Sequence, residues 1–165
     1  MKRTITVIGA GSMGTAISIL LSANGNDIKM WTPFKEEADM INTAREHIHR
    51  LPGVSVPESV VCTDDLEKAL NGAELVVLAV PSQTTRQNCR NISKYIKQGM
   101  IVVTCSKGIE ESTCMLLTDI IKQEIPQAWP VALSGPSHAE EIARDIPTAV
   151  VAASEIREAA ELVQD

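Results

Sequence analysis

Uninterrupted apolar runs recur along the chain, and a stretch with helical spacing follows most of them. The run at 75–80 is the clearest, because Leu-Val-Val-Leu-Ala-Val shows no alternation with polar residues. Such a pattern is typical of a parallel strand that is buried on both faces. The predicted strands are 3–8, 27–31, 60–63, 75–80, 100–105, 130–134 and 149–153.

Apolar residues three and four positions apart predict helices between these strands. The predicted helices are 13–24, 35–44, 65–70, 83–95, 113–124, 138–144 and 155 to the C-terminus. Asp64 or Asp65 is expected to cap the third helix, and Ser154 the last one. The positions predicted to face the core are Ala38, Ile41, Leu116, Leu117, Ile120 and Ile121.

The segment 45–59 is the least regular part of the chain. It contains Pro52, Gly53 and Pro57, and it begins with the polar run Arg-Glu-His-Ile-His-Arg. We therefore predict a loop with short structure there.

Alternation of strands and helices along the whole chain predicts a doubly wound, mostly parallel α/β sheet. In such sheets ligands bind beyond the carboxyl ends of the strands, where the strand order reverses. Five stretches that directly follow predicted strands should therefore meet at one edge of the sheet. They are 9–14, 31–35, 81–82, 106–108 and 135–137.

The stretch 9–14, Gly-Ala-Gly-Ser-Met-Gly, stands between the first predicted strand and helix. In this G-x-G-x-x-G pattern Gly9 makes the tight turn out of the strand, Gly11 lets a pyrophosphate approach the backbone, and Gly14 lets the helix pack closely on the strand. The N–H groups at the start of the helix would face the phosphates. The pattern in this context predicts a dinucleotide site; the alternative is a strand–turn–helix without a ligand.

Composition narrows the class of protein. The 165 residues suffice for one domain, and the hydrophobic fraction of 44% permits a substantial core. Aromatic residues are scarce, so the core is expected to be aliphatic. The net charge of −6 argues against a nucleic-acid surface. No apolar stretch is long enough to span a membrane, and the run after Lys2 and Arg3 is too short for a signal peptide.

The four cysteines, at 62, 89, 105 and 114, form no C-x-x-C pair and have no metal-site spacing. We interpret them as reduced, partly buried thiols of a cytoplasmic protein. His47 and His49 cannot make a metal site by themselves, and no metal is expected.

The end of the second strand leaves the choice between NAD and NADP open. An acidic residue there usually binds the ribose 2′-hydroxyl of NAD, but 31–35 reads Trp-Thr-Pro-Phe-Lys. Glu36 and Glu37 come a little late, and no arginine is present to hold a 2′-phosphate. Trp31 or Phe34 can flank the adenine, although Trp31 is equally well explained as a core residue.

Lys107 lies between Ser106 and Gly108 at the end of an apolar strand. At that edge its ammonium group would bind a substrate phosphate or polarise a carbonyl; the alternative is a solvated surface lysine. The stretch 134–137, Ser-Gly-Pro-Ser, leads into a helix, where N–H groups and the Ser137 hydroxyl can hold an anion. Ser134 or Ser137 can instead cap that helix.

Three further polar residues follow this stretch. Glu140 and Glu141 are interpreted as partners of the helix dipole. His138 is interpreted as a helix-start or surface residue rather than a proton donor.

Four motifs together resemble the NAD(P)-dependent glycerol-3-phosphate dehydrogenases. They are G-A-G-S-M-G-T-A at 9–16, V-P-S at 80–82, S-K-G at 106–108 and S-G-P-S-H-A-E-E at 134–141, the last followed by P-T-A at 147–149. The resemblance implies hydride transfer between NAD(P)H and dihydroxyacetone phosphate, which gives sn-glycerol 3-phosphate, a precursor of glycerophospholipids. It also implies cytoplasmic location and a possible homodimer of the full-length protein.

The resemblance covers nearly the whole chain but only the N-terminal domain of the family. We therefore expect 1–165 to be a dinucleotide-binding domain, and the sequence to be a truncated piece without the family's helical substrate domain. The family's proton-transferring lysine lies in that domain and matches no residue here.

By position, the resemblance implies Ser12, Met13 and Ala139 as cofactor contacts, and Lys107 as a contact to both cofactor and substrate. Lys107 is the catalytic candidate because it would position the substrate, and Gly135 and Ser137 are implied as substrate contacts. Together with the residues discussed above, the expected cofactor site comprises Gly9, Gly11, Ser12, Met13, Gly14, Trp31, Phe34, Pro81, Lys107 and Ala139.

Two other functions remain open from the residues alone. One is another dehydrogenase of the same architecture, such as a 3-hydroxyacid dehydrogenase or a ketopantoate reductase. The other is a non-catalytic nucleotide-sensing module. Lys107 and the stretch 134–137 argue against the sensor, because a sensor needs no groups on the substrate side.

Overall fold

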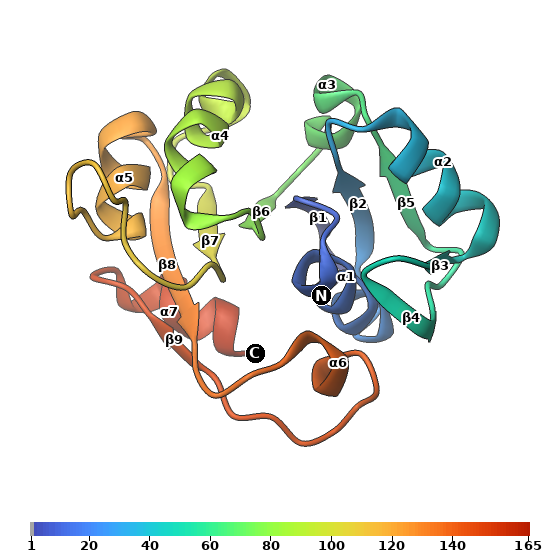
Figure 1. Cartoon of the computed structure of the whole chain (residues 1–165). Coiled ribbons are helices and arrows are strands. Elements are labelled where there is room, and N and C mark those ends of the chain that lie inside the picture. The colour runs from blue at the N-terminus through green and yellow to red at the C-terminus, as the bar shows by residue number, and fades with distance from the viewer. Residues whose placement is uncertain (1) are drawn as a thin grey trace.

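A seven-stranded sheet forms the centre of the protein (Figure 1). The structure is a computed structural model that describes residues 2–165. The strand order is β5-β2-β1-β6-β7-β8-β9. The strands of this sheet are β1 (Thr4–Ile8), β2 (Asp27–Trp31), β5 (Val60–Thr63), β6 (Leu75–Leu78), β7 (Ile101–Thr104), β8 (Trp129–Ser134) and β9 (Val151–Ala153).

All neighbouring strands from β5 to β8 pair in parallel, and only β9 runs antiparallel to β8. The chain begins in the middle at β1, moves outward through β2 to β5, and then returns to place β6 on the other side of β1. The strand order therefore reverses between β1 and β6. This topology confirms the predicted doubly wound, mostly parallel sheet.

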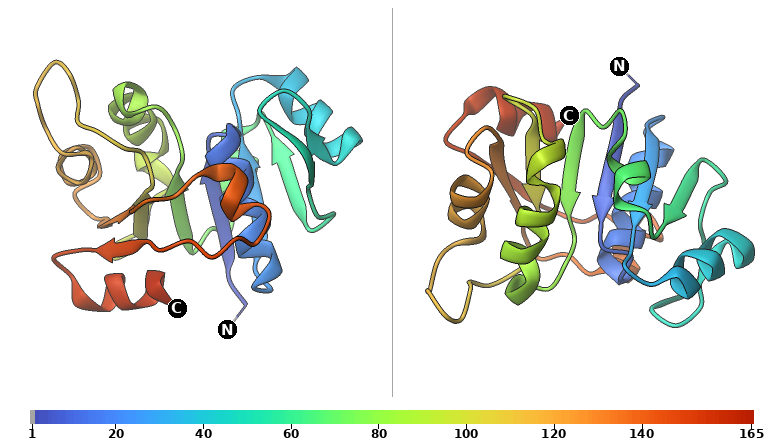
Figure 2. Two further views of the ribbon diagram at one scale, coloured as in Figure 1. Left: turned by 60° about the horizontal axis from the view of Figure 1, so that its bottom comes forward. Right: turned by 90° about the horizontal axis from the view of Figure 1, so that it is seen from above.

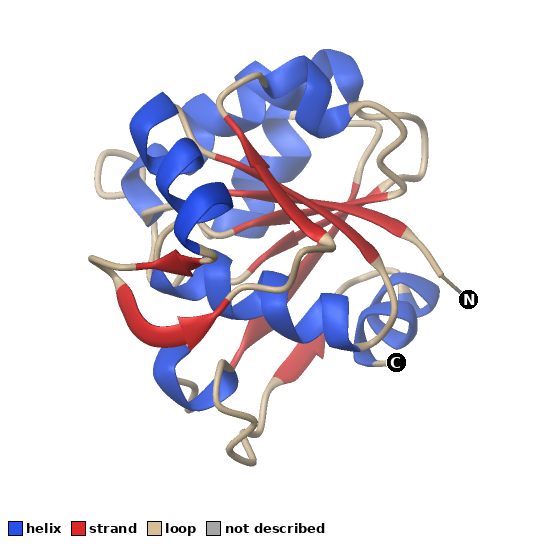
Figure 3. Cartoon of the chain, turned by 90° about the vertical axis from the view of Figure 1, so that its right-hand side faces the viewer, coloured by secondary structure: helices blue, strands red, loops and turns tan. Residues whose placement is uncertain are grey.

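Helices cover both faces of the sheet (Figures 2 and 3). They are α1 (Ser12–Ala23), α2 (Lys35–Ala44), α3 (Leu66–Leu70), α4 (Thr85–Ile92), α5 (Leu117–Glu124), α6 (Ala139–Ile142) and α7 (Arg157–Gln164), with short 3₁₀ turns η1 (Ser82–Thr84) and η2 (Ser93–Tyr95) beside α4. No helix among residues 2–165 combines the length and apolar composition needed to cross a membrane.

The two faces carry separate aliphatic clusters, which explains why β6 is apolar at every position. Val77 packs in the cluster that includes α1, α2 and α7, whereas Val76 and Leu78 pack in the cluster that includes α3, α4 and α5. Successive side chains of a strand point to opposite faces, so a strand covered on both sides has no polar face.

Several element boundaries differ from the sequence-based expectation. The segment 45–59 contains a small antiparallel pair, β3 (Glu46–His47) and β4 (Leu51–Ser55). The helix predicted at 83–95 is divided into η1, α4 and η2. The one predicted at 113–124 begins only at Leu117. Leu116 has an extended backbone and is 57% exposed, so its expected burial was wrong.

Of the two expected caps one is correct and one is wrong, and the alternative cap of α6 by a serine is not formed. The Asp65 carboxylate accepts from the backbone N–H of Lys68 at 3.1 Å at the start of α3, as predicted. The cap residue of α6 is His138, whose side chain makes no capping bond, rather than either serine. Helix α7 begins after Ile156, and the Ser154 hydroxyl accepts from the Ile156 N–H just before it.

Candidate functional site

The turn between β1 and α1 requires two of its three glycines for steric reasons. Gly9 has a φ of +106°, and a Cβ there would stand 2.5 Å from the carbonyl oxygen of Ala79. A Cβ at Gly14 would collide with the carbonyl oxygen of Gly9. Both findings agree with the predicted tight turn and the predicted close packing of helix on strand.

Gly11 is different, because its surroundings are open. It is the cap residue of α1 with φ −65° and ψ −174°, and a Cβ there would meet no atom within 4 Å. No side chain caps α1, and its first turn carries no carboxylate. Among residues 2–165 the N–H groups of that turn therefore have no side-chain partner. This arrangement fits a dinucleotide pyrophosphate, which needs N–H donors and close access to the backbone.

Lys107 stands at the carboxyl end of β7, across the switch point from this turn. Its side chain is exposed, and its ammonium group donates to the carbonyl oxygen of Ser137 at 3.2 Å. That contact brings together two stretches 30 residues apart, 106–108 and 134–137. The structure thus joins the two stretches that the sequence predicts on the substrate side.

Ser137 and Ala139 are buried, whereas His138 between them is exposed. The segment that carries α6 returns from the edge of the sheet to lie over α1 (Figure 2). Ala139 packs there in a cluster with Ala16 of α1 and Leu51 of β4. At Gly135 a Cβ would collide with the carbonyl oxygen of Ala149, so close packing of two chain segments also requires this glycine.

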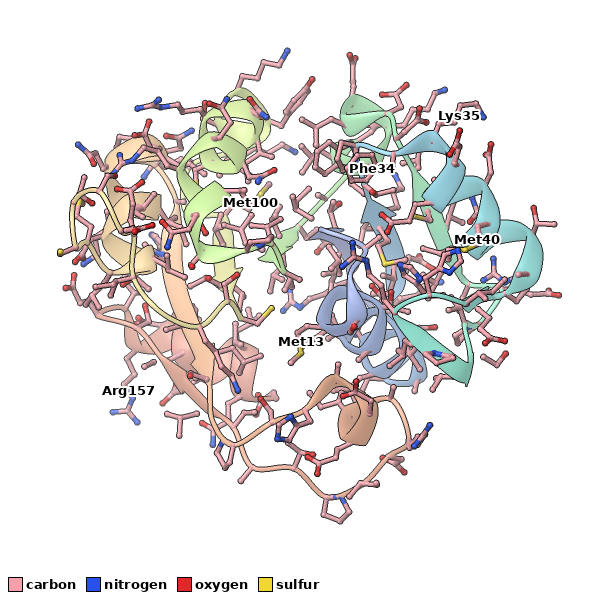
Figure 4. The ribbon with its side chains drawn as sticks, viewed as in Figure 1. Met13, Phe34, Lys35, Met40, Met100 and Arg157 are labelled. Carbon is pink, nitrogen blue, oxygen red and sulfur yellow. The ribbon has the colours of Figure 1, made fainter. Side chains whose placement is uncertain are left out.

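A cavity of about 310 Å³ lies between these elements. Met13 at the start of α1 forms one wall, and Figure 4 shows it on the side of α1 that faces the α6 segment. Lys107 and Ser137 line the opposite part. The other lining residues are Ala79, Val80, Cys105, Ser106, His138 and Ala139.

A second hollow of about 380 Å³ adjoins it on the far side of Lys107 and is lined by Ser134 and Gly135 among others. Lys107 therefore stands between two hollows at the edge of the sheet. Cys105 lines the first hollow, and burial raises the pKa of its thiol to about 12. The thiol stays protonated near neutral pH and is not a nucleophile there.

The aromatic candidates at the end of β2 lie in different surroundings. Trp31 packs on the α3–α5 cluster, and its indole N–H donates to the carbonyl oxygen of Asp64 at 3.1 Å. These contacts agree with the interpretation of Trp31 as a core residue. Phe34 is 63% exposed at the start of α2, where its ring is free to contact a ligand (Figure 4). Pro81 is exposed at the end of β6, next to η1.

The structure also brings charged residues to the end of β2 that the local sequence does not place there. The Glu37 carboxylate accepts from the buried Thr32 hydroxyl and lies 3.1 Å from Nε2 of His47. The guanidinium of Arg50 is 3.7 Å from the same carboxylate. The Ser12 hydroxyl donates to the Arg50 carbonyl at 2.7 Å, which ties the β3–β4 turn to the glycine turn.

Sequence reasoning missed this cluster because its members come from α2 and from a segment without periodicity. His47 is only 1% exposed, and no partner of its Nδ1 atom is present among residues 2–165. The polar run at 45–50 gave no signal of such burial. No group of three or more His, Cys, Asp or Glu side chains within 2–165 is arranged to hold a metal ion.

A larger apolar hollow of about 450 Å³ lies elsewhere, between α1 and α7. Aliphatic side chains such as Leu20, Leu133 and Leu162 line it. None of the residues predicted to contact cofactor or substrate belongs to it. The candidate site is therefore the smaller hollow beside Lys107, which four of the predicted residues line: Met13, Lys107, Ser137 and Ala139.

Comparison with known proteins shows which family the chain resembles. Residues 4–160 match the sequence family described as the N-terminus of NAD-dependent glycerol-3-phosphate dehydrogenase. Proteins named glycerol-3-phosphate dehydrogenase [NAD(P)+] from Agathobacter rectalis and Clostridium tetani are 43% and 45% identical over 98% and 92% of this chain. The alignments cover 48% and 43% of those proteins, so the chain spans about half the length of the curated relatives it matches.

Solved structures show the same similarity in three dimensions. The glycerol-3-phosphate dehydrogenase of Coxiella burnetii has 27% identity and a TM-score of 0.92, over 98% of this chain and 50% of that one. A UDP-D-ManNAc dehydrogenase from Pyrococcus horikoshii has 16% identity and a TM-score of 0.80, over 98% of this chain and 43% of that one. The second similarity is one of fold alone.

Proposed function

We propose that this chain, which belongs to the family of NAD-dependent glycerol-3-phosphate dehydrogenases, is the cofactor-binding half of an enzyme that reduces dihydroxyacetone phosphate to sn-glycerol 3-phosphate. The cofactor is NAD or NADP, and the product is a precursor of glycerophospholipids. The chain would then be one dinucleotide-binding domain over 1–165, with a helical substrate domain elsewhere in the full-length protein.

One observation carries the proposal. Met13 from the predicted dinucleotide turn, Lys107 from the end of β7 and Ser137 from the α6 segment line the same hollow. A cofactor whose pyrophosphate rests on the start of α1 would extend from that turn across the switch point toward Lys107. A phosphorylated substrate beside the lysine would then lie next to the reactive end of the cofactor.

The residues of the glycine turn, the Lys107 turn and the α6 segment have different roles in the proposed reaction. When bound, the nicotinamide ring supplies or accepts the hydride. Gly11 gives the pyrophosphate access to the backbone. The Lys107 ammonium faces the negative charge of the substrate, and its bond to the Ser137 carbonyl keeps the lysine directed toward the α6 segment. Gly135 and Ser137 are proposed to contact the substrate.

The experiment is steady-state kinetics of the full-length enzyme with Lys107→Ala. We expect kcat/KM for dihydroxyacetone phosphate to fall by about 10²–10³-fold, the usual cost of removing a preorganised charge donor. The matched control is Lys97→Ala, because Lys97 is an exposed lysine outside the lining of both hollows. A Lys107→Ala enzyme that folds and keeps wild-type kcat/KM would contradict the role of this residue.

Substrate profiling of the full-length enzyme separates the proposal from its alternatives. Reduction of dihydroxyacetone phosphate should exceed that of 3-ketoacids and ketopantoate. Preference for one of the latter would identify another dehydrogenase of this fold, and nucleotide binding without turnover of any of them would identify a sensor. The fragment 1–165 alone is expected to bind NAD(P)H with little turnover, because proximity and proton transfer from the second domain would be missing.

Two properties of the whole protein are part of the proposal. We place the enzyme in the cytoplasm, because all four cysteines are free thiols, as a reducing compartment maintains them. We propose a homodimer for the full-length protein, since two-fold dimers are the commonest soluble oligomers. Sedimentation analysis of the purified full-length protein tests the dimer.

A further inference from the structure

A network of charged side chains lies behind the Lys107 turn, away from both hollows. At its centre is Arg86 of α4, whose side chain is 17% exposed. Its guanidinium makes two bonds to the Glu110 carboxylate, from Nε at 2.8 Å and from Nη2 at 2.7 Å. The same guanidinium donates to Glu124 and Gln123 of α5. Arg86 therefore joins α4, α5 and the chain segment that follows Lys107.

That segment, residues 109–116, is a loop without a helix or a strand. An isolated bridge joins Ile109 to Leu116 across its base. Ile109 is 43% exposed and Leu116 is 57% exposed. Glu110, in contrast, is 6% exposed and also accepts from the Thr113 hydroxyl. The buried carboxylate is thus the anchor of an otherwise exposed loop.

The connection from β6 to α4 holds the same loop at a second place. The Gln83 side-chain amide donates to the carbonyl oxygen of Ile109 at 3.1 Å, and its oxygen accepts from the N–H of Glu111 at 2.9 Å. The Ser106 hydroxyl donates to the carbonyl oxygen of Val80. These bonds join Ser106, directly before Lys107, and Ile109 and Glu111, shortly after it, to the segment that follows β6.

We propose that Arg86, Glu110 and Gln83 are positioning residues, which fix the Lys107 turn relative to the end of β6 and so place the Lys107 ammonium at the substrate. This inference rests on the proposed function. None of the three lines the hollows beside Lys107, so they act through the loop and not by contact with a ligand.

The chemistry of the pair suits a fixed anchor. Its two parallel bonds define both distance and orientation, which a lysine cannot reproduce because its ammonium is a point charge. The Arg86 guanidinium holds the pKa of Glu110 down to about 2, so the carboxylate remains ionised and the pair intact throughout the neutral range. The anchor therefore does not depend on pH in the neutral range.

The test compares two arginines of the same network in the full-length enzyme. Arg86→Met removes the bonds to Glu110, and Arg86→Lys is the milder variant in case the first does not fold. Arg90→Ala is the control, since Arg90 binds Glu124 at 2.9 and 3.1 Å but makes no bond to the 109–116 loop. We expect both Arg86 variants to lower kcat and raise KM for dihydroxyacetone phosphate, together about tenfold or more in kcat/KM. Arg90→Ala should leave these constants at wild-type values.

Hydrogen exchange supplies a readout that does not depend on turnover. The amide of Glu110 donates to the Met115 carbonyl, and that of Cys114 to the Glu110 carbonyl. Their exchange should accelerate in Arg86→Met and remain unchanged in Arg90→Ala. Unchanged exchange in Arg86→Met, or Arg86 kinetics equal to those of Arg90→Ala, would overturn the inference. An inactive wild-type enzyme would instead refute the proposed function, and the exchange experiment would still decide whether Arg86 fixes the loop.

Discussion

The glycine turn permits a prediction in which fold and ligand binding respond to different residues. Gly9→Ala places a methyl group 2.5 Å from the Ala79 carbonyl oxygen, at a φ of +106° that alanine rarely adopts. The backbone strain costs about 1–3 kcal/mol, and the overlap costs about 1–3 kcal/mol more. The free energy of unfolding of this domain should therefore fall by about 2–6 kcal/mol, and Tm should fall with it.

Gly11→Ala is the matched variant with the opposite expectation. Its backbone angles suit alanine, and a Cβ there meets nothing within 4 Å, so Tm without cofactor should stay the same or rise slightly. The methyl group would instead stand where the pyrophosphate approaches. If this steric overlap costs about 1–3 kcal/mol of binding free energy, it weakens NAD(P)H binding by about 5- to 150-fold.

Two assays separate these effects in the full-length protein. Circular dichroism melts without cofactor give Tm, and fluorescence titration with NADH and NADPH gives Kd. Wild-type cofactor affinity in Gly11→Ala would refute the placement of the pyrophosphate at this turn. A loss of stability in Gly11→Ala equal to that in Gly9→Ala would refute the steric argument itself.

Two further predictions concern titratable groups. Cys114 is exposed, whereas burial raises the pKa of the other three thiols to about 12. N-ethylmaleimide at pH 7.5 should therefore label Cys114 alone, which mass spectrometry of the digested protein measures. Labelling of another cysteine at the same rate would contradict this prediction. The Arg86 guanidinium lowers the pKa of Glu110 from its ordinary value of 4.5 to about 2. The ion pair therefore contributes its full stabilisation at pH values above 4.5, and this contribution is lost as the pH falls toward 2. The Tm difference between wild type and Glu110→Gln should accordingly shrink between pH 5 and pH 2 in thermal melts, and a difference that does not depend on pH would speak against the pair.

Much of the fold was predictable, because burial on both faces leaves a direct mark on the sequence. The run at 75–80 reads as a central strand because both of its faces pack on helices. Predictions were poorer where exposed apolar residues imitate a helical pattern. Leu116 has the right spacing for α5, yet the turn that Glu110 anchors keeps it extended and outside the helix.

The candidate site was predictable in part, and the reason is positional. Stretches that follow parallel strands must meet at one edge of the sheet, so Lys107 and the stretch 134–137 could be associated before their contact was known. The roles of individual residues as cofactor or substrate contacts remain predictions. Side chains that reach the site from helices, such as Glu37, follow no such rule.

The sequence by itself determined the alternation of strands and helices, the glycine turn between the first strand and helix, and the family to which the chain belongs. These are local properties, because periodicity and backbone freedom are decided within a few residues. Only the tertiary structure decided that Arg50 joins Glu37 at the end of β2 and that Arg86 holds Glu110 behind the Lys107 turn. Each of these pairs joins residues 13 or more positions apart, and such contacts follow from packing between elements, which no local pattern records.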